Sequence, residues 1–250
     1  MAMIMLPIVR PYEYLIIQKL IESAGSVMYG GLIDYLKLQI EDFSKDAMDH
    51  AIKYMLNKPW FVENINELIL DATLLDVEFE EYMRDLLNYG IGKYEIDYGE
   101  RSEGEVFRLW SSYRKTQTAQ LMLIDPGDIN KGTKIIDGVV YAYVTVLKDE
   151  RLENLDYDDG YIDSDTFQWE SVANIKETEL DKLKNCNEMH IFVRKVKMED
   201  NITLPFTYIG KGAPYYLNGP KKNGAHLFKV EMENAAPEDI YFDFKLRRLR

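Results

Sequence analysis

Aromatic and basic side chains occur close together in three short segments of this 250-residue chain. In an extended strand, alternate side chains share one face, so Phe192 and Arg194 would lie together, with Lys195 opposite. A ring beside a guanidinium suits nucleic acid, because bases stack on rings and phosphates accept hydrogen bonds from cations. The alternative is that the rings are core and the cations only solvate a sheet edge. The segments contain Arg108, Trp110, Tyr113, Arg114 and Lys115, then His190, Phe192, Arg194 and Lys195, then Phe206, Tyr208 and Lys211.

Enzyme signatures are missing from the sequence. There is no G-x-x-x-x-G-K-[ST] phosphate loop, no G-x-S-x-G and no H-E-x-x-H. The acids at 156–165 lack the D-x-D-x-D-G order of a calcium loop. Glu177 and Lys182 do not form the acid pair with Glu-x-Lys that a two-carboxylate nuclease needs. The sequence therefore predicts a binding domain with no catalytic residue, no metal and no cofactor.

The charge is uneven along the chain. The formal net charge is −13; residues 1–100 carry 8 Lys/Arg against 18 Asp/Glu, and residues 101–250 carry 22 against 25. Eight acids are concentrated between Asp149 and Asp165, so the remainder of the second part is net basic. This distribution argues against indiscriminate coating of nucleic acid and favours a localised binding face.

The single cysteine, Cys186, excludes an internal disulfide framework and fits a reducing compartment. No apolar run is long enough to cross a bilayer, and the start at 1–7 is too short and uncharged for a signal peptide. We expect a cytoplasmic protein with no membrane contact.

Residues 1–89 are predicted to be helical. Apolar residues repeat at helical spacing after Pro11, again at 32–40, and again after Ser44, a plausible N-cap. A last helix is expected at 74–87. Such a segment is a connector or docking bundle in our interpretation, with a winged-helix-like unit as the alternative; its acidity disfavours DNA binding.

Residues 90–250 are predicted to form strands after a glycine- and tyrosine-rich linker. Asp137-Gly138 is a hairpin signal between strands at 133–136 and 139–148, because both residues tolerate positive φ. Further strands are expected at 166–170, 189–198, 204–210, 225–232 and 240–246, with helices near 116–123 and 176–184. The fold class is α+β: a helical segment followed by a small, partly open antiparallel β-barrel.

Four segments in order resemble a known family. They are F-R-L-W-S-S-Y-R-K (107–115), T-F-Q-W-E-S (166–171), H-I-F-V-R-K (190–195) and P-F-T-Y-I-G-K (205–211). Together with Y-A-Y-V-T-V-L-K (141–148), they are similar to the C-terminal domain of bacterial helicases that carry an N-terminal phospholipase-D-type nuclease. Two segments depart from the family pattern: Val172 follows Ser171 where the family has Gln, and Arg114-Lys115 replaces Thr-Arg.

The resemblance implies a target-recognition domain of an ATP-dependent, modification-dependent restriction enzyme, with a PUA-like or SET-and-RING-associated-like barrel. Such barrels flip a base, here methylated cytosine in double-stranded DNA, between aromatic rings, and discrimination by one methyl group is worth only about 1–3 kcal/mol. It also implies helicase and nuclease domains in the same polypeptide, and a homodimer is possible. Carried onto this sequence, the base-pocket candidates are Tyr113, Trp169, Tyr208 and Asp137, and the phosphate candidates are Arg108, Arg114, Lys115, Arg194, Lys195 and Lys211.

Two other classes of function compete with DNA recognition. In the first, the acidic helices and the barrel form a protein-interaction or dimerisation domain that braces a helicase motor. In the second, the chain is an enzyme that acts on a base, which the missing metal ligands disfavour. Asp137 is itself open to two readings, as an acceptor for a cytosine amino group or as a turn residue.

Overall fold

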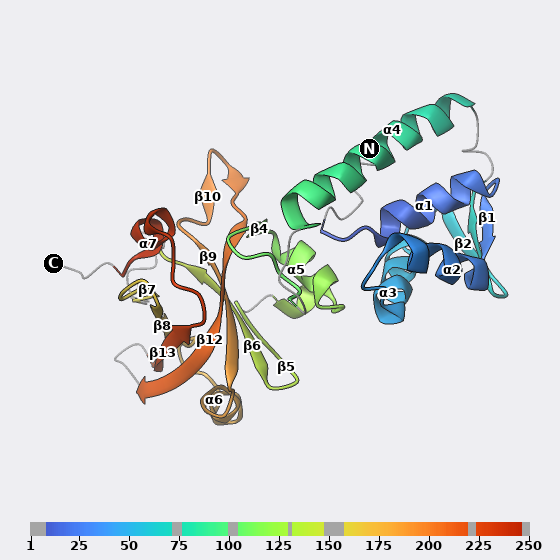
Figure 1. The fold of residues 1–250 in the computed structure, drawn as a ribbon. Helices are drawn as coiled ribbons and strands as arrows, with labels where there is room; N and C mark the ends of the chain where they lie inside the picture. The colour runs from blue at the N-terminus through green and yellow to red at the C-terminus, as the bar shows by residue number, and fades with distance from the viewer. Residues whose placement is uncertain are drawn as a thin grey trace. The chain divides into compact units, whose positions relative to one another are not determined.

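The computed structural model describes residues 9–71, 77–99, 105–129, 132–147, 158–219 and 224–246. The chain divides into two compact units (Figure 1). The first unit comprises Met1–Phe107 and Thr116–Asp125, and the sheet unit comprises Arg108–Lys115 and Pro126–Arg250.

The first unit combines helices with a small sheet. Strands β1, β2 and β3 form an antiparallel sheet in the order β1-β3-β2. The prediction of helices alone was therefore wrong here, because strands of three or four residues are too short for hydrophobic periodicity to show. The elements are α1 (Tyr12–Glu22), β1 (Ser26–Met28), α2 (Tyr29–Gln39), α3 (Lys45–Leu56), β2 (Phe61–Asn64), β3 (Glu67–Leu70), α4 (Val77–Tyr94) and a π-helical turn, η3 (Glu95–Gly99).

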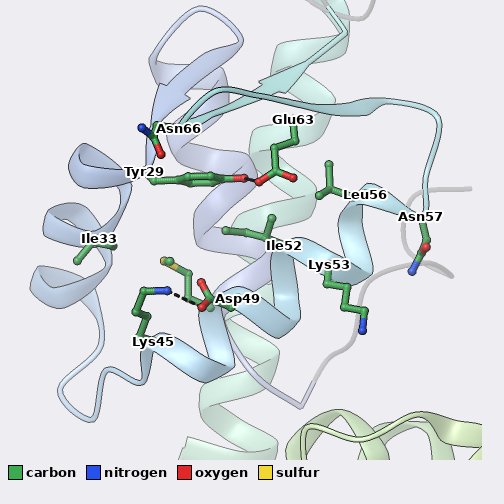
Figure 2. Close-up of a pocket in the computed structure, with 11 residues that line it drawn as sticks. Tyr29, Ile33, Lys45, Asp49, Ile52, Lys53, Leu56, Asn57, Glu63 and Asn66 are labelled. Atoms are coloured by element: carbon green, nitrogen blue, oxygen red, sulfur yellow. Dashed lines mark hydrogen bonds and ion pairs between the residues drawn. The ribbon is translucent and has the colours of Figure 1, made fainter.

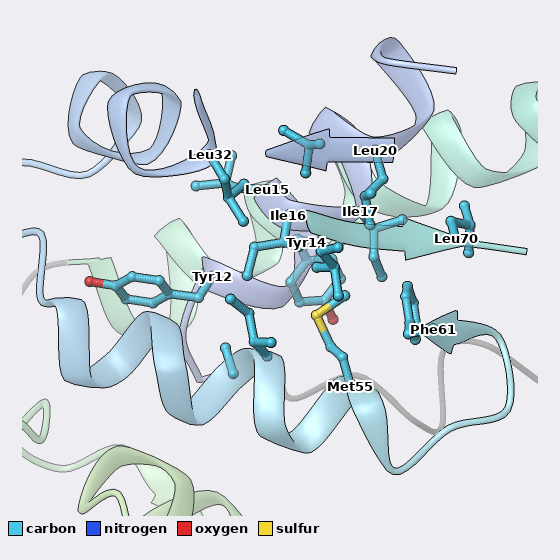
Figure 3. Packing of buried hydrophobic residues seen from close by; sticks show 14 of the residues in the cluster. Tyr12, Tyr14, Leu15, Ile16, Ile17, Leu20, Leu32, Met55, Phe61 and Leu70 are labelled. Carbon is cyan, nitrogen blue, oxygen red and sulfur yellow. The ribbon is translucent and has the colours of Figure 1, made fainter. Parts of the chain in front are cut away.

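Helix α1 runs through the core of the first unit (Figure 3). Ile16 and Leu20 are fully buried, and the predicted inward stripe of α1 is confirmed. Leu32 from α2 and Met55 from α3 pack into the same cluster. Side chains from four helices, including Met83 and Leu87 of α4, and from the sheet thus close one core, which fixes α3 against the β2–β3 hairpin.

Helix α3 begins as the sequence predicts. The Ser44 hydroxyl accepts a hydrogen bond from the amide of Ala47 at 3.2 Å, and Asp46 lies in the first turn, where the helix dipole favours an acid. Helix α4 extends further than predicted, to Tyr94 rather than ending near Leu87. Gly90 lies inside this helix, where a linker was expected.

The sheet unit is built on an eight-stranded sheet. Its order is β5-β6-β9-β12-β13-β8-β7, and β4 pairs with β12 beside this path. The elements are β4 (Ser112–Tyr113), the first residue of α5 (Lys115–Leu121, which from Thr116 on belongs to the first unit), η4 (Pro126–Ile129), β5 (Thr133–Ile136), β6 (Val139–Thr145), β7 (Gly160–Tyr161), β8 (Thr166–Glu170), α6 (Glu177–Lys184), β9 (Glu188–Arg194), β10 (Met198–Glu199), β11 (Ile202–Thr203), β12 (Phe206–Asn218), β13 (Leu227–Met232) and α7 (Glu238–Phe244).

The strand pairing differs from the antiparallel barrel expected from the sequence. Strands β6 and β9 are parallel, with Tyr143 opposite Phe192. The described strands leave β5 and β7 at the two ends of the sheet, so a closed PUA-like barrel is not confirmed. Long β12 pairs with β9 through its first half and with β13 through its second, with a register shift near Ile209. Hydrophobic patterns identify strands but not their partners, which is why the parallel pair was missed.

Two local predictions in the sheet unit had opposite outcomes. The β5–β6 hairpin is confirmed, with Asp137 at φ 48° and Gly138 at φ 83°. The strand predicted at 240–246 is instead helix α7, which starts after Pro237. Its apolar residues at 240 and 244 are spaced four apart, and Phe242, which a strand would place on the same face as these two, is 54% exposed. The acids in its first turn and the preceding proline favour the helix over the strand.

No helix among the described residues has both the length and the apolar character needed to cross a membrane.

Candidate functional site

One face of the sheet unit carries a row of aromatic rings. Tyr143 on β6 stacks on Phe192 of β9, with centroids 4.9 Å apart, and Phe192 lies 5.0 Å from Tyr208 of β12. Val193 points to the opposite face, into the main core of the sheet unit. The predicted alternation along β9 is therefore confirmed. We refer to Tyr143, Phe192, Tyr208 and Phe206 as the ring face.

The segment before α5 covers the ring face. Tyr113 on β4 meets Phe192 edge-on, with centroids 6.2 Å apart, and its hydroxyl accepts a hydrogen bond from the amide of Arg108 at 2.8 Å. The amide of Trp110 donates to the carbonyl of Tyr208 at 2.8 Å. As a result Tyr113 is 0% and Tyr208 2% exposed. These rings form a second small core in this structure.

Trp169 belongs to a different cluster. It packs against Phe228 with centroids 5.4 Å apart and is 4% exposed within the main core. The structure thus brings Tyr113 and Tyr208 together through Phe192 but does not bring Trp169 to them. A role for any of the three rings in base recognition stays a prediction.

Two cations lie at one end of the ring face. The guanidinium of Arg194 lies over the ring of Phe206, and the ammonium of Lys115 lies 5.3 Å from the centroid of Tyr143. Arg194 is held by hydrogen bonds to the Thr145 hydroxyl and to a backbone carbonyl, each 3.0 Å long. Because both side chains are partly buried and fixed by rings, their charged ends are preorganised. We call Lys115, Arg194 and the nearby exposed Lys197 the cationic edge.

The electrostatics of the cationic edge show that its charges act on one another. Burial, and then the positive charges of Arg194 and Lys197, lower the pKa of Lys115 below its usual range. Burial also lowers the pKa of Arg194, although a guanidinium remains charged at any ordinary pH. An anion placed here would offset the repulsion among the three cations and compensate for part of the hydration that Lys115 and Arg194 lose on burial. The arrangement is therefore chemically suited to a phosphate group.

The remaining predicted phosphate candidates lie elsewhere. Lys195 is exposed and pairs with Asp243 at 3.1 Å, and Lys211 pairs with Glu188 at 3.5 Å. Arg114 is exposed and Arg108 is half-buried, each in the segment that covers the ring face. The structure therefore gathers Lys115 and Arg194 out of the six predicted cations.

A hydrogen-bonded chain occupies the other end of the ring face. His190 contacts the Tyr208 hydroxyl through Nδ1 at 2.8 Å and the Glu188 carboxylate through Nε2 at 3.0 Å. The ring of Tyr141 stacks on His190 with centroids 4.9 Å apart. Burial alone would raise the pKa of Glu188. The contacts with His190 and Lys211 outweigh burial and hold this pKa below its usual range. This chain holds His190 and Tyr208 in place within the face.

Asp137 lies in the turn of the β5–β6 hairpin and is exposed, with the positive φ that this turn type requires. Its structural role is confirmed, and contact with a cytosine stays a prediction. Sequence reasoning missed Tyr143 and Lys197 as members of the site. The alternation in Y-A-Y-V-T-V could have placed Tyr143 on the ring face, whereas no local pattern indicates Lys197.

A pocket of about 590 Å³ lies in the first unit between α2, α3 and the β2–β3 hairpin (Figure 2). Its polar side is closed by the Tyr29 hydroxyl, which donates a hydrogen bond of 2.5 Å to the Glu63 carboxylate. Burial, and then this hydrogen bond, raise the pKa of Tyr29. The lining residues are Tyr29, Ile33, Lys45, Met48, Asp49, Ile52, Lys53, Leu56, Asn57, Glu63 and Asn66.

Comparison with known proteins gives one family match. A family model described as a domain of unknown function, DUF3427, matches residues 107–244, more than half of the chain. No curated protein matches the chain. Among solved structures, the 5-hydroxymethylcytosine-specific restriction enzyme AbaSI is similar with a TM-score of 0.27 and 12% identity, over 71% of this chain and 60% of the AbaSI chain. A similarity of this size does not establish a shared fold.

Proposed function

The chain belongs to the DUF3427 family, and we propose that its sheet unit is a DNA-recognition domain. The observation that carries the proposal is the cationic edge. Lys115 comes from the start of α5 and Arg194 from the end of β9, yet both lie against Phe206, at 5.9 and 4.2 Å from its centroid. A phosphate at this position receives charge-assisted hydrogen bonds from donors that are already oriented.

The net charge limits how this domain binds. With −13 on the whole chain, long-range attraction to a polyanion is absent, so affinity comes from a few localised contacts. Each phosphate contact contributes about −0.9 to the slope of log K against log salt for duplex DNA. Binding through the cationic edge is therefore salt-dependent with a small slope. Specificity must come from contacts to bases rather than to phosphates.

The finer proposal concerns the base. The resemblance of segments 107–115, 166–171, 190–195 and 205–211 to helicase-associated recognition domains supports a preference for modified cytosine in double-stranded DNA. Because Tyr113 and Tyr208 pack against Phe192, a flipped base reaches these rings only if the covering segment moves. In the same proposal, helicase and nuclease domains lie elsewhere in a longer polypeptide, and the domain itself is not an enzyme.

The test is fluorescence anisotropy of the whole chain with three duplexes of one sequence, carrying cytosine, 5-methylcytosine or 5-hydroxymethylcytosine, over a salt series. DNA recognition predicts saturable binding with a small negative salt slope. Recognition of modified cytosine predicts in addition a several-fold preference for a modified duplex.

The two levels of the proposal fail separately. Equal binding to the three duplexes removes the modified-cytosine proposal and keeps DNA recognition. Absence of saturable binding to every duplex at low salt removes both. An Arg194→Gln variant that binds as the parent does would show that the contact lies away from the cationic edge.

A further inference from the structure

The first unit has the element order of a winged-helix domain. Helix α1, strand β1, helices α2 and α3, and the hairpin β2–β3 follow one another, and the sheet order is β1-β3-β2. In a helix-turn-helix arrangement of this kind, the second helix and the hairpin are the parts presented to DNA. Here these are α3 and residues 64–67, and the pocket of Figure 2 lies between them.

The groups on these parts offer no net positive charge to a duplex. On α3 the exposed acids Asp46 and Asp49 balance the exposed Lys45 and Lys53, and Asp49 pairs with Lys45. The hairpin tip has the sequence Asn-Ile-Asn-Glu at 64–67, which contains no Lys or Arg. Residues 1–100 carry a net charge of −10, from 8 basic against 18 acidic residues. Phosphates would therefore meet no net positive charge on α3, and repulsion from the acidic residues around it, at the surface where a winged helix usually receives them.

The floor of the pocket is apolar, whereas its rim carries both charges and amides. Ile33, Ile52 and Leu56 line it from α2 and α3, with buried Met48 beneath. In Figure 2, the phenol of Tyr29 reaches across to Glu63 on the hairpin side. An apolar floor with a polar rim is the form of pocket that receives one large side chain of a protein partner.

Exposed apolar residues also occur on the strands of this small sheet. Ile65 at the hairpin tip is 87% exposed, and Val62 on β2 and Met28 on β1 are 53% and 54% exposed. Apolar side chains at the tip of a wing do not contact phosphates, whereas they add area to a protein interface. The pocket and the strands beside it thus offer one apolar anchor site and a further apolar surface.

We propose that this pocket binds a protein segment that inserts one apolar side chain over Ile33 and Ile52 and places Lys or Arg beside it. Lys45 and Lys53 balance Asp49 and Glu63 in the rim itself, whereas the surrounding residues 1–100 carry a net charge of −10. The occupant is therefore basic, because opposite charge increases the rate of association and the specificity of the complex. The winged-helix fold is then used for docking, while DNA contact belongs to the sheet unit. This proposal is independent of the proposed DNA recognition.

The test uses the whole chain with labelled isoleucine and methionine methyl groups. The probe is a synthetic amphipathic helix of Leu and Lys; two comparison peptides replace every Leu by Ala or every Lys by Glu, and a DNA duplex is the fourth arm. We expect methyl shifts at Ile33, Ile52 and Met48 with the Leu-Lys probe, and no shift at Ile16, which lies in the core of α1. Each comparison peptide should bind at least tenfold more weakly.

Variants of the rim separate this pocket from general attraction of a cationic peptide. Glu63→Lys, at an exposed position in the rim, should weaken the Leu-Lys probe at least tenfold, and Ile33→Trp should do the same by filling the pocket. The matched control is Glu22→Lys, which makes the same charge change at an exposed position of α1 outside the pocket. This variant should weaken binding of the Leu-Lys probe about twofold or less. Shifts at Ile33 and Ile52 with the duplex, or equal loss for the two Glu→Lys variants, would overturn the proposal.

Discussion

The guanidinium of Arg194 lies over the ring of Phe206, with its Cζ 4.2 Å from the ring centroid. This contact joins the end of β9 to the start of β12 and fixes a charge that would otherwise move freely on a long side chain. Lys115 approaches the same ring from α5.

Removing the charge of Arg194 should weaken DNA binding and reduce its salt dependence. Arg194→Gln keeps a polar side chain but loses one phosphate contact, so the magnitude of the salt slope should fall by about 0.9. The loss of affinity should be roughly tenfold, or about 1.4 kcal/mol. Anisotropy over a salt series measures both quantities.

Lys195→Gln is the matched control, since Lys195 is the next residue and already pairs with Asp243. We expect it to change the slope by less than half as much. Equal effects of the two variants would mean that the net charge, and not the cationic edge, determines binding.

The lowered pKa of Lys115 predicts a pH dependence of stability. Because the unfolded chain has the ordinary value of 10.5, it binds more protons than the folded chain between the lowered pKa and 10.5. The free energy of unfolding of the parent should therefore rise with pH across this window, relative to a Lys115→Met variant. Urea unfolding of both proteins at several alkaline pH values measures the difference. Tyrosines with raised pKa values lower the free energy of unfolding as the pH rises. Both proteins contain these tyrosines, so their contribution cancels in the difference between the two. A difference in the free energy of unfolding that does not change with pH would contradict a lowered pKa of Lys115.

The sequence predicts those features that depend on near neighbours. Alternation along β9 places Phe192 and Arg194 on one face, and Ser44 marks the start of α3, because both depend on residues a few positions apart. The parallel pairing of β6 and β9 depends on a long connection and leaves no local trace. The same holds for Lys197, whose effect on Lys115 appears only in three dimensions.

The error at α7 has a different origin. Residues 240–244 contain apolar side chains two apart and also four apart, so the sequence fits both the period of a strand and that of a helix. Pro237 and the acids at 238 and 239 favour a helix start, and this signal was stronger than the alternation. The ring face shows a further limit: a pattern of rings and cations on one face does not reveal that another segment covers the rings.

Two glycines of α4 should respond in opposite directions to the same substitution. A Cβ on Gly90 would lie 2.1 Å from the buried ring of Tyr14, so Gly90→Ala should destabilise the fold by about 1–3 kcal/mol. A Cβ on Gly92 meets nothing within 4 Å, so Gly92→Ala should stabilise it by about 0.5–1 kcal/mol through helix propensity. Urea unfolding compares the two variants. The same sign for both would mean that α4 does not pack on α1 as described.

The β5–β6 turn separates a structural role of Asp137 from a role in base recognition. Gly138 has φ +83°, which costs an L-residue about 1–2 kcal/mol, so Gly138→Ala should destabilise the sheet unit by that amount. Asp137→Asn should leave stability within about 0.5 kcal/mol, because Asn is equally suited to this turn. If Asp137 only shapes the turn, the affinity for each of the three duplexes is also unchanged in Asp137→Asn. A folded Asp137→Asn variant that binds all three duplexes more weakly would instead place this carboxylate at the base, since the cytosine amino group is common to the three duplexes and Asn offers it one neutral amide oxygen in place of a charged carboxylate.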